Sequence, residues 1–195
     1  MAPVMVESSR VVSLLSSMYL CKPVKAAIEK WKIALYEDKS LFMWDLKEAL
    51  GEIDTESEKE LEDLLWDFTQ LFIGPYKMLC PPWESVYTSS KRLMMQEAHD
   101  EVRTFYHEAG LAMNTPDIMS DHIGAELNFL AVLLQKMNIE SEKRQNCLYL
   151  TKRFIDEHLR AWIPQFTNDM EAAADTDFYK ALAQTTRNLN DFFRF

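Results

Sequence analysis

Glycine is scarce in this sequence, since only four of its 195 residues are glycine. Hairpin turns and phosphate-binding loops depend on glycine, because they need backbone conformations or close approaches that a side chain would block. The sequence contains neither a G-x-G-x-x-G pattern nor a Walker-type loop. The shortage of glycine therefore favours helices and argues against a nucleotide-binding fold.

Cysteines and long apolar runs are also scarce. The three cysteines, Cys21, Cys80 and Cys147, are odd in number and form no C-x-x-C pair, so neither a disulfide framework nor a zinc site is expected. No apolar run approaches the ~20 residues of a membrane helix, and the first residues show no signal-peptide pattern. We therefore expect a protein of the reducing cytoplasm that is not inserted into a membrane.

Basic residues are outnumbered by acidic ones. The chain has 21 Lys and Arg against 31 Asp and Glu, which gives a formal net charge of −10. Nucleic acid is not expected as a partner, because phosphate binding needs a basic face. The negative charge either suits a basic partner, such as an arginine-bearing peptide, or only keeps the protein soluble.

Apolar residues make up 48% of the chain and aromatic residues 12%, which is ample material for a core. At this length roughly 70% of the unfolded chain's surface can be buried. Apolar residues recur with a helical period in successive segments, and we predict an all-α, single-domain bundle of about nine to eleven helices over residues 1–195. The periodic segments lie at about 11–19, 24–35, 41–50, 61–72, 91–109, 122–137, 141–159, 164–173 and 177–193.

Two local signals refine this prediction. Thr55 and Glu58 have the spacing of a capping box, which predicts a helix start. From Gly74 to about Ser90 there is no helical period, and the segment is rich in proline and aromatic residues. A loop of this length in a compact domain is usually functional or disordered, and its aromatic residues argue against disorder.

Catalytic and metal-binding patterns are missing. The histidines, His99, His107, His122 and His158, lack the E-x-x-H and H-E-x-x-H spacings of metal sites, and we interpret them as surface residues. No G-x-S-x-G pattern occurs, and nothing in the sequence would orient a base toward Cys80. We expect no enzymatic activity, no metal and no cofactor.

Three short clusters remain: Leu71-Phe72 before Gly74-Pro75, the stretch Pro81–Tyr87, and the stretch Ser120–Leu127. Each has a plain structural interpretation, as core, as a plug of the domain, or as a helix start with Asp121 in the first turn. Together, L-F-x-G-P, P-P-W-x-S-V-Y and D-H-I-x-x-E-L resemble the TorD/DmsD family of redox-enzyme maturation chaperones, relatives of the NarJ type.

The resemblance implies an all-α cytoplasmic chaperone. Such proteins bind the twin-arginine signal peptide of a molybdenum-cofactor oxidoreductase precursor until the cofactor is inserted and before export. The implied partners are the leader peptide and the apo-precursor of a molybdoenzyme of the DMSO or TMAO reductase type. A homodimer formed by exchange of elements is left open, as is a helical adaptor or nucleotide-binding regulator unrelated to export.

The resemblance also implies the peptide-binding residues. They are Leu71, Phe72, Pro82, Trp83, Ser85, Tyr87, Asp121 and His122, and the chemistry of a leader adds Glu84 and Glu126. A leader carries two arginines and then an apolar stretch. We expect the three carboxylates to pair with guanidinium groups and the apolar side chains to contact the apolar stretch. His122 ordinarily titrates near neutrality, so we expect its contribution to vary with pH.

Overall fold

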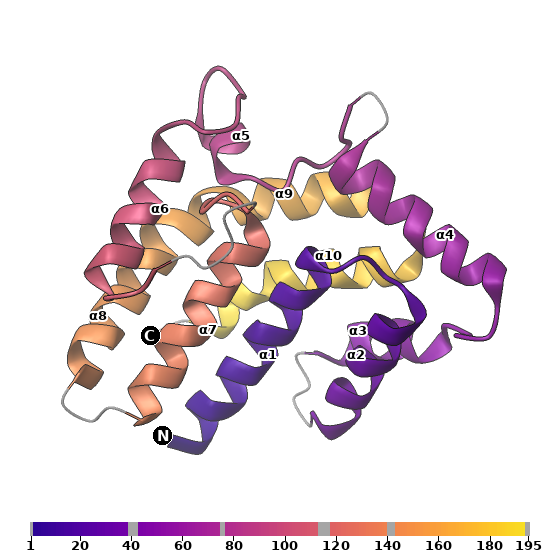
Figure 1. Ribbon diagram of the computed structural model, residues 1–195, viewed down its shortest axis with the longest axis horizontal. Helices are drawn as coiled ribbons and strands as arrows, with labels where there is room; N and C mark the ends of the chain where they lie inside the picture. The colour runs from indigo at the N-terminus through magenta and orange to yellow at the C-terminus, as the bar shows by residue number, and fades with distance from the viewer. Residues whose placement is uncertain (1, 39–42, 75–76, 113–117, 140–142, 194–195) are drawn as a thin grey trace. The chain divides into compact units, whose positions relative to one another are not determined.

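The computed structural model describes residues 2–38, 43–74, 77–112, 118–139 and 143–193 (Figure 1). These residues form helices joined by short connections, and they contain no β-strand, only one isolated antiparallel bridge between Trp83 and His122. The all-α prediction is confirmed. None of the described helices combines the length and the apolarity needed to cross a membrane.

The chain divides into two compact units. Unit 1 contains Met1–Leu20 and Pro82–Trp162, and unit 2 contains Cys21–Pro81 and Ile163–Arg194. The division at Trp162 falls inside helix α9 (Arg160–Ala173). The prediction of a single domain over residues 1–195 stays a prediction.

Unit 1 is built around helix α7. Its helices are α1 (Ala2–Leu20), α5 (Glu84–Thr88), α6 (Glu97–Glu108), α7 (Ile123–Ile139) and α8 (Arg144–Phe154), followed by the π-helical turn η4 (Ile155–Leu159). Helix α7 packs against α1 and α8, and Figure 1 shows α1 and α7 side by side. Most α7 side chains are buried, as expected for a helix that is apolar on nearly every face.

Glycine at position 124 allows α1 and α7 to approach closely. A Cβ added to Gly124 would lie 2.4 Å from Cγ of Leu20. The Oγ of Ser16 also donates a hydrogen bond to the Gly124 carbonyl, at 2.7 Å. The α7 backbone at Gly124 therefore lies directly against side chains of α1.

Unit 2 has an aromatic core. Its elements are α2 (Lys25–Glu37), α3 (Trp44–Glu52), α4 (Glu58–Phe68), the π-helical turn η2 (Thr69–Ile73), most of α9, and α10 (Asp177–Phe192). Trp31 stacks on Phe178 with ring centroids 5.8 Å apart. Phe72 contacts the rings of Phe166 and Tyr179 at 6.4 and 5.8 Å. These contacts fix α10 against the helices that precede it.

The ends of α4 and η2 follow from local chemistry. Ser57, not Thr55, caps α4, because its Oγ accepts the Glu60 N–H, while Glu60 accepts the Asp54 N–H at 2.8 Å. The predicted capping box was therefore wrong by two residues, since the same Ser/Thr-x-x-Glu spacing occurs twice in this stretch. Gly74 ends η2 at φ 65°, where a side chain would collide with the Lys77 backbone.

Two predicted segments differ from the structure. The expected loop over 74–90 contains the helical turn α5, and the helix expected from Lys91 begins only at Glu97. Arg92 and Met95 adopt positive φ, which a continuous helix does not allow. The helix start expected near Leu41 and the aromatic residue Tyr76 lie outside the described residues.

Candidate peptide-binding site

Two of the predicted motifs meet in unit 1. The N–H of Ile123 donates to the Pro82 carbonyl and the N–H of Glu84 donates to the Asp121 carbonyl, both at 2.9 Å. These bonds form the isolated bridge between Trp83 and His122, whose rings meet edge to face at 5.8 Å. The proline–tryptophan segment and the start of α7 therefore form one structural unit, a pairing that sequence spacing did not predict.

Asp121 caps a helix that is distant in the sequence. Its Oδ2 accepts hydrogen bonds from the Ser85 N–H at 3.1 Å and from the Ser85 Oγ at 2.5 Å. Asp121 thus supplies an acceptor for a backbone N–H in the first turn of α5, whose own N-cap side chain makes no capping hydrogen bond. The sequence placed Asp121 at the start of its own helix, but its carboxylate faces α5 instead.

His99 completes the surroundings of Asp121. Its Nδ1 lies 3.4 Å from the Asp121 Oδ1 and 2.9 Å from the Ser120 Oγ. The Ser120 hydroxyl donates its only proton to the His99 carbonyl at 2.7 Å, so the His99 Nδ1 carries the hydrogen that it shares with Ser120. The carboxylate of Asp121 is thus held by groups from α5 and α6.

Unit 1 contains a second buried polar contact, between Glu84 and His158. The Oε2 of Glu84 is 2.8 Å from Nδ1 of His158, and both side chains are almost fully buried. The Glu126 Oε2 accepts the Trp162 Nε1–H at 3.0 Å. Burial, with the neighbouring Glu84 carboxylate, raises the pKa of Glu126 well above its usual range.

The three predicted arginine ligands are therefore inside the protein. The exposed fractions are 2% for Glu84 and zero for Asp121 and Glu126. Each carboxyl group is occupied by a partner within unit 1. Their pairing with guanidinium groups stays a prediction, and their observed role is to organise the segment that carries Trp83.

His122 differs from its expected behaviour. Burial lowers its pKa to about 4, against the opposing charge of Asp121. Its Nδ1 accepts the Gly124 N–H at 3.0 Å, which requires an unprotonated nitrogen. The lowered pKa moves the titration of His122 below neutrality, and the variation of its contribution to peptide binding with pH stays a prediction. The interpretation as surface residues was also wrong for His158, which is 2% exposed, because its partner Glu84 is distant in the sequence.

Leu71 and Phe72 belong to the core of unit 2. Leu71 is fully buried and Phe72 is 6% exposed. The Leu71 carbonyl accepts the Cys80 N–H at 2.8 Å. Burial raises the pKa of the Cys80 thiol to about 12, opposite to the lowered pKa of reactive cysteines. The accessible apolar residues of this part are Ile73 and Leu79, which are about half exposed.

Accessible apolar surface in unit 1 lies at α5 and beside it, on Trp83 and Tyr87, which the sequence predicted, and on three residues that it missed. Trp83 and Tyr87 are partly exposed. Leu93, Met94 and Met95, which we call the methionine loop, are 54%, 38% and 62% exposed. The only sequence signal was a run of three large apolar residues where a regular helix was expected.

The methionine loop is held in a defined conformation. The Gln96 N–H donates to the Ser85 Oγ at 3.2 Å, and the Gln96 amide donates to the carbonyls of Met94 and Met95. The Arg92 guanidinium lies over the Tyr87 ring at 5.8 Å. A chain of hydrogen bonds thus runs from Asp121 through Ser85 to the loop.

The fold and the sequence together define the class of protein. Residues 20–168 match the family described as nitrate reductase delta subunit, and the chain belongs to this family. The resemblance to TorD/DmsD chaperones is confirmed by two relatives. The chain is 29% identical to the chaperone protein TorD of Photobacterium profundum over 69% of this chain and 63% of that protein. It is 31% identical to the Tat proofreading chaperone DmsD of Salmonella typhi over 79% of this chain and 72% of that protein.

The match thus spans less than two thirds of the length of the TorD relative. A solved structure agrees on the fold over a longer range. It is described as that of a candidate redox enzyme maturation protein from Archaeoglobus fulgidus, and it superposes with a TM-score of 0.66. The superposition covers 94% of this chain and 93% of that one at 19% sequence identity, and shows a shared fold.

Proposed function

We propose that this protein is a cytoplasmic chaperone of redox-enzyme maturation that binds the twin-arginine signal peptide of a molybdoenzyme precursor. It would hold the precursor until the cofactor is inserted and before export. The names of the relatives, a Tat proofreading chaperone and a TorD chaperone, support this assignment. The observation that carries it is the fixed apolar surface of Trp83, Tyr87 and the methionine loop.

That surface has the chemistry of a site for an apolar peptide segment. Exposed clusters of large apolar side chains commonly mark interaction sites. Methionine is flexible and polarisable, so it adapts to segments of differing shape. Trp83 and Tyr87 add rigid rings, the kind of side chain that contributes most at interfaces. A leader's apolar stretch is a suitable occupant.

The buried polar groups position this surface. Asp121 holds Ser85, Ser85 holds Gln96, and Gln96 fixes the carbonyls of the methionine loop. The surface is therefore formed before a peptide arrives, which reduces the entropy lost on binding. Binding then protects the precursor by mass action on the bound state.

The test is a calorimetric titration with a synthetic peptide that carries two arginines followed by an apolar stretch. Met95→Ser should weaken binding by about 1 kcal/mol, roughly fivefold in Kd. Ile139→Ser is the matched control, because Ile139 is a 72% exposed apolar residue at the far end of α7. Equal binding by both variants and the unaltered protein would remove the methionine loop from the site.

A second experiment addresses the partner. The purified protein, immobilised and exposed to native cytoplasm, should retain an unprocessed twin-arginine precursor of a molybdoenzyme, of the DMSO or TMAO reductase type. Recovery of a protein without such a leader as the main partner would favour the alternative of a helical adaptor.

A further inference from the structure

The methionines of this chain differ widely in accessibility. Met94 and Met95, in the methionine loop, are 38% and 62% exposed. Among the other methionines whose burial the structure describes, four are 1% exposed or less and two are partly covered: Met18, Met43, Met137 and Met170, and then Met78 and Met119. Within that part of the chain, Met94 and Met95 are therefore the two thioethers most open to a soluble reagent.

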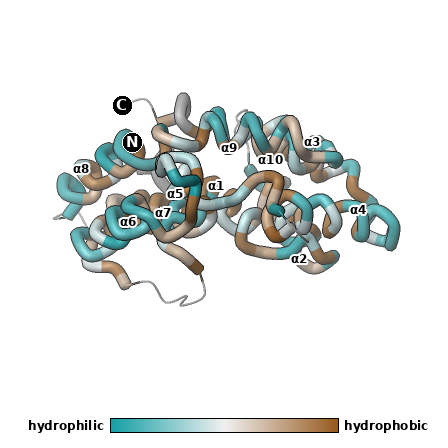
Figure 2. The backbone as a smooth tube through the Cα atoms, turned by 90° about the horizontal axis from the view of Figure 1, so that it is seen from above, coloured by the Kyte–Doolittle hydropathy of each residue, from teal (hydrophilic) through white to brown (hydrophobic). Residues whose placement is uncertain are grey.

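The exposure of these two side chains belongs to a defined backbone conformation. Met95 has a φ of 56°, in the left-handed region that residues other than glycine rarely adopt. The Gln96 amide donates to the Met94 and Met95 carbonyls at 3.0 and 3.3 Å, and the Gln96 N–H donates to the buried Ser85 hydroxyl. Hydrophilic residues predominate in α6, the helix that follows the loop (Figure 2). The two methionines thus form a fixed apolar feature beside a polar helix.

An accessible thioether undergoes two-electron oxidation by a hydroperoxide. The sulfur lone pair attacks one oxygen of hydrogen peroxide, so that an S–O bond forms and the O–O bond breaks. The thioether becomes a sulfoxide, and the second oxygen leaves as water with both hydrogens of the peroxide. A sulfoxide is polar, and covering it with an apolar segment that offers no hydrogen-bond donor costs affinity.

We propose that Met94 and Met95 make the proposed peptide site sensitive to oxidation. Their conversion to sulfoxides by a hydroperoxide releases the apolar stretch of the leader, and reduction of the sulfoxides restores binding. The inference rests on the proposed function and concerns unit 1 alone. The site has five accessible apolar side chains, Trp83, Tyr87, Leu93, Met94 and Met95, so oxidation makes two of the five polar.

The reverse reaction needs a reductase and a dithiol. A methionine sulfoxide reductase transfers two electrons from the dithiol to the sulfoxide, which returns to the thioether. The sulfoxide oxygen leaves as water and the dithiol becomes a disulfide. A thiol alone does not reverse methionine sulfoxide, which separates the loop from Cys21, the exposed cysteine. A thiol reductant restores a cysteine that has been oxidised to a sulfenic acid or a disulfide.

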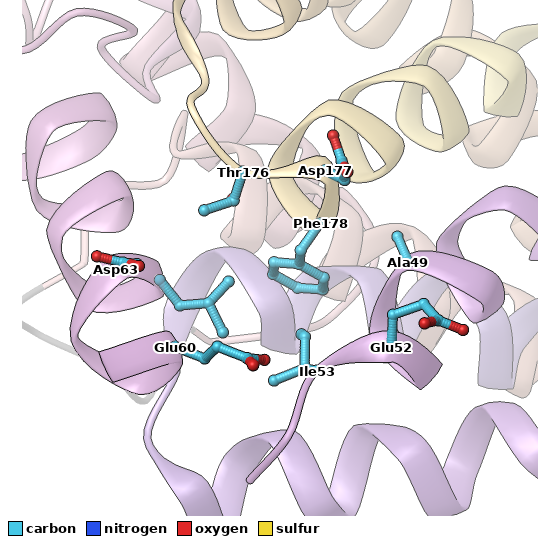
Figure 3. A pocket seen from close by; sticks show the side chains of 9 residues that line it. Ala49, Glu52, Ile53, Glu60, Asp63, Thr176, Asp177 and Phe178 are labelled. Carbon is cyan, nitrogen blue, oxygen red and sulfur yellow. The ribbon is translucent and has the colours of Figure 1, made fainter. Parts of the chain in front are cut away.

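A cavity in unit 2 serves as an internal comparison. Its lining consists of Ala, Asp, Glu, Ile, Leu, Thr and Phe side chains and contains no sulfur atom (Figure 3). A hydroperoxide therefore leaves the lining of this cavity chemically unaltered. A peptide held there would stay bound after oxidation, whereas a peptide held by the methionine loop would be released.

The experiment compares three proteins before and after brief treatment with hydrogen peroxide, each followed by a thiol reductant. They are the unaltered protein, the variant Met94→Leu with Met95→Leu, and the control Met78→Leu with Met119→Leu. Leucine keeps the apolar volume and cannot be oxidised. The control removes the same number of thioethers outside the methionine loop. Mass spectrometry of proteolytic fragments identifies the oxidised methionines, and circular dichroism follows the fold.

Calorimetric titration with a twin-arginine leader peptide gives the ratio of Kd after treatment to Kd before it. We expect Met94 and Met95 to be oxidised before the buried methionines. The ratio should be about ten for the unaltered protein and for the control, and about one for the loop variant. Incubation of the oxidised unaltered protein with methionine sulfoxide reductases for both epimers and a dithiol should return its Kd to the starting value.

Three results would overturn the oxidation sensitivity and leave the proposed function standing. They are a ratio near one for the unaltered protein with Met94 and Met95 fully oxidised, an equal rise in the loop variant, and a loss that persists after the sulfoxides are reduced. The reductase result decides even where the loop variant binds too weakly to give a ratio. Absence of binding by the untreated, unaltered protein would overturn both proposals.

Discussion

Ser85 and Asp121 share two hydrogen bonds, from the Ser85 backbone N–H at 3.1 Å and from its hydroxyl at 2.5 Å, to a single carboxylate oxygen. The pair joins the segment containing Trp83 to the start of α7. Both side chains are fully buried. A fully buried carboxylate that accepts two hydrogen bonds is costly to replace.

We expect Asp121→Ala to lower the free energy of unfolding by about 2–3 kcal/mol, because Ser85 loses its acceptor and α5 its cap. Denaturant unfolding measures this loss. Asp100→Ala is the control, since Asp100 is exposed and only pairs with Arg103 at 3.8 Å on the same helix. That variant should stay within about 0.5 kcal/mol. If Asp121→Ala also lost only about 0.5 kcal/mol, the capping of α5 by Asp121 would contribute little to stability.

Trp83→Ala should weaken binding of the leader peptide by more than about 1 kcal/mol while the fold survives. Trp83 is partly exposed, and its ring meets that of His122 edge to face. Calorimetric titration gives the affinity, and circular dichroism follows the fold. Trp66→Ala is the matched control, because Trp66 is 57% exposed on α4 in unit 2. Collapse of thermal stability with unchanged binding would identify Trp83 as core.

His122 makes stability depend on pH. Its pKa is about 4 in the folded protein and about 6.5 when unfolded, so the unfolded state takes up the proton first as pH falls. Its contribution is present above about pH 6.5 and is lost between there and pH 4. His122→Asn keeps a cap acceptor for Gly124 and removes the titration.

The measurement for His122 is the free energy of unfolding at pH 7 and at pH 4.5. The unaltered protein should lose about 2 kcal/mol more than His122→Asn over this interval. Parallel losses in the two proteins would show that His122 is protonated in the folded state as readily as in the unfolded one.

Glu126 makes stability depend on pH in the opposite direction. Its folded pKa is raised, so the unfolded state ionises first as pH rises, and stability falls above the ordinary pKa of about 4.3. Glu126→Gln keeps an acceptor for the Trp162 N–H and cannot ionise. We expect this variant to be more stable than the unaltered protein at pH 7.5, with little difference at pH 4. A loss of stability at both pH values would mean that the carboxyl group itself is needed.

The sequence predicted the helices well where apolar periodicity extends over several turns, as in α4, α7 and α10. It failed where the determining contact is distant. Residues 91–96 have helical composition, but Gln96 is held by Ser85, so the chain turns with Arg92 and Met95 at positive φ. The helical turn α5 depends in the same way on Asp121.

The prediction of the site also succeeded for local patterns and failed for distant contacts. The motifs identified the segments that meet, Pro82–Tyr87 and Asp121–Leu127, but not the direction in which each side chain points. Glu84 and His158 are 74 residues apart, so nothing in the sequence indicates that their side chains are buried together. Glu84, Asp121 and Glu126 were interpreted as arginine ligands because a leader is basic. In the structure these three acids are buried, whereas acids on α3 and α4 are exposed.

The close approach of α1 and α7 at Gly124 makes two positions mutually dependent. Alanine at 124 would place its methyl group 2.4 Å from Cγ of Leu20, so the Leu20 side chain would have to move. A smaller residue at 20 would vacate that space. The two positions should therefore vary together among related sequences, and a library that varies position 124 alone would find it intolerant although the pair is permissive.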